Sequence, residues 1–211
     1  MYLRYIFVKH VSRRYNIRMN KLKTALLLER IGNLLRSEER ADGAAAGLQS
    51  VHVQILTYLS RCNRYSNTPA GVTEYLGTTK GTVSQSINIL EERGFIEKRA
   101  DENDGRVVRL LLTTEGRSFV EGSQPPSEFS GALDSFDPAE LDSLSSMLTK
   151  FLTALQRRNK RKMFGVCHTC RHFRENGLGD KHQCGLTLEP LSEDDSLKIC
   201  REHEAPESIV A

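Results

Sequence analysis

Residues 78–106 read TTKGTVSQSINILEERGFIEKRADENDGR, and this stretch decides the fold of the chain. It predicts a helix over about residues 80–93 that ends at Gly94, since glycine often terminates a helix. Two β-prone runs follow at residues 95–99 and 106–113, with turn-forming residues between them. A helix followed by a small basic hairpin is typical of a winged helix, whose helix enters a DNA groove.

A second predicted helix lies immediately before this stretch. Thr68 and Pro69 are a helix start, because a capping side chain precedes a proline in the first turn. The helix is expected to reach Leu76 and to end at Gly77. Helix, tight turn and second helix give the geometry of a helix-turn-helix.

The helix over residues 80–93 divides into two faces at the 100° step of an α-helix. Val83, Ile87 and Leu90 share the face that we expect to pack in the core. The opposite face carries Ser, Gln and Asn, which are side chains that bind base edges or phosphates. The alternative interpretation is an ordinary solvated face. We predict DNA contacts from Thr79, Lys80, Thr82, Ser84, Gln85 and Asn88.

The hairpin combines an apolar side with a basic side. Ile96, Val107, Leu110 and Leu112 can pack inward, while four other positions of the hairpin provide positive charge. A wing of this kind lies over the minor groove or the DNA backbone, where the negative potential attracts arginine. The charges could instead serve solubility alone. The predicted wing contacts are Lys98, Arg99 and Arg106, and Arg109 adds positive charge.

The segment LGTTKGTVSQSINILEERGFIEKRADENDGRVVRLLLTTEG, residues 76–116, resembles the core of a MarR-type transcriptional regulator. The resemblance extends with less specificity over about residues 20–160. It implies a homodimer whose two winged helices bind a roughly palindromic double-stranded DNA operator, and it implies a small-molecule or redox effector. By this resemblance Arg106 is the wing arginine, and Asp104 helps to hold it in place.

Helices with apolar stripes flank the winged helix. Residues 20–39 and 48–62 show helical spacing of apolar residues, and His52 falls on the apolar face of the second segment. His52 could sense pH or a ligand, but a buried structural role is the commoner one. After a capping box at Asp137–Glu140, an apolar seam runs to Leu155. In a MarR-like dimer, the first and last helices of both subunits would pack together.

Composition limits the functional classes. The formal net charge of +3 is mild, but the first 23 residues carry seven Lys and Arg and no acid. Residues 1–19 are either a basic arm or a wrongly assigned translation start. Apolar runs are too short to cross a bilayer, so we expect a cytoplasmic protein without a membrane partner. We find no nucleophile–base pair, phosphate loop or suitably spaced carboxylate pair, so an enzyme is not expected.

The segment 163–211 departs from the family. Four of the five cysteines lie there, and Cys-x-x-Cys spacing places two thiolates close enough to share a metal. The segment is poor in apolar residues, so a metal would supply much of its folding energy. A redox-switch disulfide and unligated thiols are the alternatives. The predicted ligands are Cys167, Cys170, Cys184 and Cys200, with His203 as a substitute.

The spacing of the cysteines does not decide which metal they bind. Four thiolates suit structural zinc or an iron–sulfur cluster equally. Cys200 and His203 could form a second zinc knuckle, whereas widely spaced single cysteines fit a cluster. Metal loss would then loosen the tail beside the last helix and change the spacing of the two recognition helices.

The sequence therefore predicts a mainly α protein with a small β-hairpin wing, an α+β fold that forms a winged helix-turn-helix dimer. Its expected parts are an extension (1–19), a DNA-binding and dimerisation domain (20–162) and a small metal-stabilised segment (163–211). The predicted function is that of a sequence-specific transcriptional regulator modulated through its cysteine site. The alternative is a winged-helix protein-interaction module with a structural zinc tail.

Overall fold

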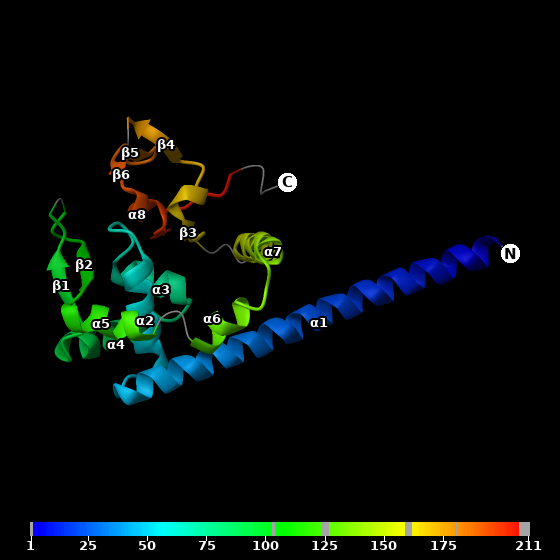
Figure 1. Ribbon diagram of the computed structural model, residues 1–211, viewed down its shortest axis with the longest axis horizontal. Helices are drawn as coiled ribbons and strands as arrows, with labels where there is room; N and C mark the ends of the chain where they lie inside the picture. Colours follow the sequence, from blue (N-terminus) through cyan, green and yellow to red (C-terminus); the bar gives the residue numbers. More distant parts are fainter. Residues whose placement is uncertain (1, 103, 124–126, 159–161, 180, 207–211) are drawn as a thin grey trace.

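The computed structural model describes residues 2–102, 104–123, 127–158, 162–179 and 181–206, without the side chains of residues 2–15, 122, 123 and 127. Helices and one hairpin form the part before the tail (Figure 1). Their order is α1 (Tyr2–Ala45), α2 (Ser50–Arg61), α3 (Pro69–Leu76), α4 (Lys80–Glu92), β1 (Ile96–Ala100), β2 (Val108–Leu112), α5 (Thr114–Ser123), α6 (Ser127–Leu133) and α7 (Pro138–Arg158).

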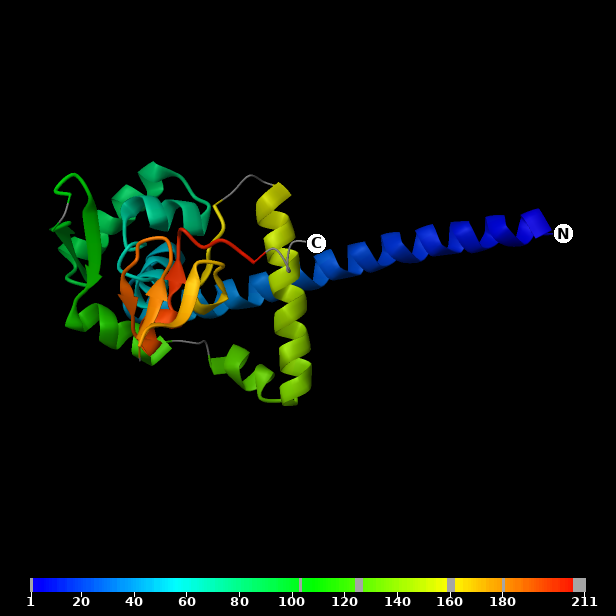
Figure 2. The same cartoon turned by 90° about the horizontal axis from the view of Figure 1, so that it is seen from above.

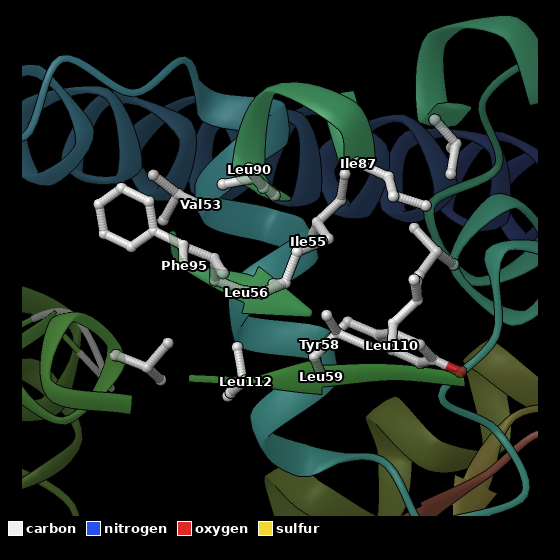
Figure 3. Close-up of a cluster of buried hydrophobic side chains, with 14 of the residues drawn as sticks. Val53, Ile55, Leu56, Tyr58, Leu59, Ile87, Leu90, Phe95, Leu110 and Leu112 are labelled. Atoms are coloured by element: carbon white, nitrogen blue, oxygen red, sulfur yellow. The ribbon is translucent and has the colours of Figure 1, made fainter. Parts of the chain in front are cut away.

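A single hydrophobic core joins the helix-turn-helix to the hairpin. Helix α2 lies at its centre and buries Val53, Ile55 and Leu56 completely (Figure 3). Val83, Ile87 and Leu90 of α4 are also buried, which confirms the face predicted to pack inward. Apolar burial of this kind is the main stabilising contribution to a domain of this size.

The ends of the short helices follow their predicted capping residues. The Thr68 side chain accepts a hydrogen bond from the Gly71 N–H at 3.1 Å, and Thr79 accepts one from Thr82 N–H at 3.2 Å. Gly77 ends α3 in the left-handed region at φ 63°, where a side chain would be strained. These caps fix the turn between α3 and α4, and so fix the orientation of α4.

The wing is a two-stranded antiparallel hairpin. Strands β1 and β2 pair from Ile96 opposite Leu112 to Ala100 opposite Val108. Ile96, Leu110 and Leu112 point into the core, as the alternation predicted. The fold is therefore mainly helical, with a β-hairpin wing.

Helices α1 and α7 differ from the elements of the core. Helix α1 is 44 residues long and runs unbroken past residue 19, well beyond the predicted 20–39 (Figure 1). Helix α7 runs across the direction of α1 (Figure 2), and of its side chains only Thr153 is buried. The predicted capping box is present, since Asp137 and Glu140 exchange hydrogen bonds. Helix α6 was not predicted.

The tail is a small β-rich segment. Two short antiparallel sheets form, one of β3 with β7 and one in the order β4-β5-β6. The elements are β3 (Gly165–Val166), the 3-10 turn η1 (Cys167–Thr169), β4 (Phe173–Leu178), β5 (Lys181–Cys184), β6 (Pro190–Leu191), α8 (Glu193–Ser196) and β7 (Ile199–Cys200).

Candidate functional site

The outer face of α4 is exposed and polar. Ser84, Gln85 and Asn88 lie on the side of the helix opposite its buried residues. Thr79, Lys80 and Thr82 are exposed at the N-terminal end, where free backbone N–H groups favour an anion such as phosphate. All six residues predicted to contact DNA from this helix are therefore exposed.

The basic side chains of the wing differ in the residues that they contact. Lys98 donates to Asn88 Oδ1 at 2.8 Å and to Glu91 at 2.6 Å, so β1 is tied to α4. Arg99 pairs with Glu97 on its own strand. Rearrangement of the Lys98 contacts would therefore accompany any contact of Asn88 with a base.

Arg106 stands out at the wing tip. Its side chain is 91% exposed, and Asp104 Oδ1 accepts from both its backbone N–H (3.0 Å) and its Nε (3.1 Å). These hydrogen bonds hold the pKa of the Asp104 carboxyl below its usual range. Asp104 therefore supports Arg106 as expected, and it leaves part of the guanidinium directed to solvent.

Arg109 has a different role from the one predicted. Its side chain is only 20% exposed, and Nε donates to Asp101 at 2.7 Å. Nη1 donates to the Tyr65 carbonyl at 3.0 Å, and Leu110 N–H donates to the Asn67 carbonyl at 2.8 Å. The expectation of a free positive charge is wrong here, because Arg109 joins the wing to the loop between α2 and α3.

A cavity of about 170 Å³ lies where the tail meets this loop. The cavity is bordered by Cys167, Cys170, Cys184 and Cys200. Cys167 lies in η1 and Cys170 directly follows it, whereas Cys184 and Cys200 lie in β5 and β7. Its remaining lining is largely apolar, and Asn63 and Tyr65 of the α2–α3 loop also border it. The four predicted ligands are therefore brought together around one space.

The environment of the four sulfurs is not uniform. Burial, and then the three neighbouring cysteines, raise the pKa of the Cys167 thiol to about 12. Burial also raises the pKa of Cys200, against the effect of hydrogen bonds from the Asn63 side chain and the Glu202 N–H. At Cys184 burial alone would raise the pKa, but hydrogen bonds from Thr187 and Leu186 lower it overall. Glu204 N–H donates to Cys170 Sγ at 3.4 Å.

The histidines lie mostly outside the cavity. His203 is buried, its Nε2 is 2.9 Å from Thr169 Oγ1, and it does not border the cavity. His172 does border it. His52 is buried in the core and accepts the Gln49 N–H through Nδ1, which is the structural role. Burial, and then Arg93, hold the pKa of His52 low.

Among the described residues, no group of three or more His, Cys, Asp or Glu side chains is arranged to hold a metal ion. None of the helices in the same part of the chain is both long and apolar enough to span a membrane.

Sequence analysis did not single out Asn63 or the inward role of Arg109. Asn63 is 5% exposed, and its Oδ1 accepts from Tyr65 N–H, Ser66 N–H and Ser66 Oγ. Asn63 borders the same cavity as Cys200. An isolated asparagine carries no pattern from which such a role could have been predicted.

Comparison with known proteins identifies the central part of the chain. Residues 46–107 match the MarR family. The transcriptional repressor MprA of Escherichia coli K12 is 26% identical over 136 residues, which span 64% of this chain and 77% of MprA. About a third of the chain therefore lies outside this match.

Solved structures show the same fold. A DNA complex of MepR from Staphylococcus aureus aligns with a TM-score of 0.51 and 22% identity, over 62% of this chain and 96% of MepR. CouR of Rhodococcus jostii RHA1, bound to p-coumaroyl-CoA, aligns with a TM-score of 0.50 and 18% identity, over 61% of this chain and 90% of CouR.

Proposed function

We propose that the chain is a winged helix-turn-helix transcriptional regulator of the MarR family, rather than an enzyme, and that it binds a specific DNA operator as a homodimer. The observation that carries the proposal is the exposed polar face of α4 beside the wing arginine. Gln85 and Asn88 would bind base edges, while Lys80 and Arg106 would contact phosphate or the minor groove. MepR, which shares the fold, was solved with DNA.

The dimer proposal rests on the outer helices. Leu22, Leu26 and Ile31 of α1 are exposed, and so are Leu148 and Phe151 of α7. Soluble monomers rarely expose long apolar stripes. A second copy of the chain that packs against α1 and α7 would bury both stripes, and would hold two copies of α4 in one complex.

The tail supplies the proposed control. The four cysteines around one cavity support a metal site, with zinc and an iron–sulfur cluster as the two candidates. A small-molecule effector remains a separate prediction. Its nearest support is the fold shared with CouR, which was solved with p-coumaroyl-CoA.

The proposal is tested by fluorescence anisotropy with the DNA upstream of the protein's own gene, and by sedimentation for the dimer. We expect saturable binding to one site as a dimer, with affinity that falls steeply with salt because phosphate contacts release counterions. Arg106→Ala should weaken binding to all sequences. Arg174→Ala, on the tail surface, is the matched control and should leave affinity unchanged. Equal, weak binding to every sequence would overturn the proposal and favour a protein-interaction module.

A further inference from the structure

The geometry points to an iron–sulfur cluster on Cys167, Cys170, Cys184 and Cys200, with Asn63 as a positioning residue that links the cluster to the winged helix. The proposed cluster site does not depend on the proposed function. The link to DNA binding rests on the proposed function, so the two parts are tested separately.

The size of the cavity favours a cluster over a single ion. Thiolates bound to one zinc lie about 2.3 Å from it, so the four sulfurs meet closely and leave no space between them. Here the four cysteines border a cavity of about 170 Å³, several times the ~30 Å³ of a liquid water molecule. In the described residues no three potential ligands are grouped to hold one ion. A group of several atoms fits this arrangement better.

The lining of the cavity also suits an iron–sulfur cluster. Apart from the cysteines it includes Phe173, Leu186 and Leu191, which would keep water from a cluster. Among the lining residues, Glu202 is the one acid. An apolar shell with four sulfur ligands is the environment in which iron–sulfur clusters are held.

One backbone N–H group points at a sulfur of the set, since Glu204 N–H donates to Cys170 Sγ at 3.4 Å. A neutral thiol is a weak acceptor, whereas a metal-bound thiolate is a strong one. Hydrogen bonds to the sulfurs are among the contacts that set the reduction potential of a cluster. The tail thus provides one such donor, at Cys170.

Asn63 connects this site to the winged helix. Its side chain borders the same cavity as Cys200, while its Oδ1 accepts from Tyr65 and Ser66 and so shapes the loop before α3. The tail is joined to the same loop by the backbone, because Asn63 N–H donates to the Ile199 carbonyl at 2.9 Å. A change at Cys200 therefore acts directly on the loop.

From this loop the contacts continue to both DNA-binding elements. The Arg201 N–H donates to Ser66 Oγ of the loop at 2.9 Å. The Arg201 guanidinium donates to the Glu74 carboxylate of α3 at 2.5 and 2.7 Å. On the other side, Arg109 and Leu110 of β2 bind the carbonyls of Tyr65 and Asn67. The route runs from the cysteine site to α3 and the wing, and it differs from the predicted route through α7.

The ligand is tested on the full chain purified without oxygen. We expect a brown protein with visible absorbance, containing iron and acid-labile sulfide in comparable amounts. Cys184→Ser should lose the colour and most of the iron. Cys62→Ser is the matched control, because Cys62 is buried outside the cavity, and should keep both. Zinc without sulfide, or a protein with four free thiols and no metal, would overturn the cluster.

The linking role is tested with Asn63→Asp, which keeps an acceptor for Tyr65 and Ser66 but replaces the amide group at the cavity with a carboxylate. The cluster should be retained with a lower reduction potential, because a negative charge is added beside it. Asn67→Asp, in the same loop but away from the cavity, should leave the potential unchanged. An unchanged potential in Asn63→Asp would overturn the role of Asn63.

The coupling to DNA is tested by operator affinity with and without the cluster. We expect the stripped wild type to bind about fivefold more weakly or worse, within the usual range of allosteric coupling. In Asn63→Asp this difference should shrink to about twofold. Equal affinity of loaded and stripped wild type would overturn the link but not the cluster. Absence of operator binding in both states would instead refute the proposed function.

Discussion

The winged helix and the cysteine tail are stabilised in different ways. Sixteen buried apolar residues between Leu48 and Val120 form one continuous cluster in the winged helix. In the described part of the tail, the buried apolar residues are Cys167 and Leu191. The first region can fold by hydrophobic burial, whereas the second depends on polar contacts, on docking and on whatever its cysteines bind.

This difference separates DNA recognition from its control. The DNA-binding face is built on a rigid core, so its geometry is set before any ligand binds. The tail has little intrinsic stability, and a bound group would change it more than it changes the core. Regions of low local stability are those in which ligand-dependent switching occurs.

The largest expected effect comes from matched leucine truncations. Leu56→Ala should destabilise the winged helix by about 2–5 kcal/mol, because Leu56 is fully buried and a cavity would remain. Leu191→Ala, which truncates another buried leucine, should destabilise the tail and leave the unfolding transition of the winged helix unchanged. Urea unfolding followed by circular dichroism measures both. Equal loss in the two variants would mean that the regions form one cooperative unit.

A smaller effect is expected at the DNA-binding face. Gln85→Ala should lower operator affinity by about 1–3 kcal/mol and relax the preference for one base pair, because a base contact is removed. The fold should be unaffected, since Gln85 is exposed. Anisotropy titrations with single base-pair variants of the operator measure this. Ser60→Ala, exposed on α2, is the control. Unchanged base preference in Gln85→Ala would count against α4 as the base-reading helix.

The smallest effect is expected at the ion pair between the two regions. Glu74→Gln removes the carboxylate that Arg201 binds, and should weaken tail docking by about 1 kcal/mol, as for a partly exposed ion pair. Limited proteolysis of the tail measures the docking. No change in the cleavage rate would show that this ion pair does not hold the tail.

The same pair gives a pH dependence of defined sign. Hydrogen bonds from Arg201 hold the pKa of Glu74 below its usual value, against the effect of burial. A lowered pKa in the folded state contributes stability above the unfolded pKa of about 4.3, and this contribution is lost as pH falls through the folded pKa. Tail docking should therefore weaken below about pH 4 in the wild type, and less so in Glu74→Gln.

The sequence predicted the elements that local signals determine. Thr79 and Gly77 have chemical reasons to begin and end helices, and the spacing of Val83, Ile87 and Leu90 marks a buried face. All of these features are present in the structure. The resemblance to a family added the supporting role of Asp104, which the hydrogen bonds to Arg106 confirm.

Long-range contacts were beyond the reach of such signals. Arg109 alternates correctly for an exposed strand position, but its partner Tyr65 lies 44 residues earlier. The strands of the tail are two to six residues long, too short for periodicity to reveal. Cysteine spacing predicted the ligand set, whereas the cavity between the cysteines and the approach of Asn63 depend on docking of the tail.

Hydrogen exchange, measured on the full chain before and after removal of the metal or cluster, tests the central claim most directly. We predict that protection falls in residues 163–206 and in the loop 63–67, while the amides of α2 and α4 keep theirs. Such a pattern would mean that a ligand-dependent tail acts on a self-supporting DNA-binding unit through this loop. Unchanged protection in the tail, or equal loss in α2 and α4, would contradict the account.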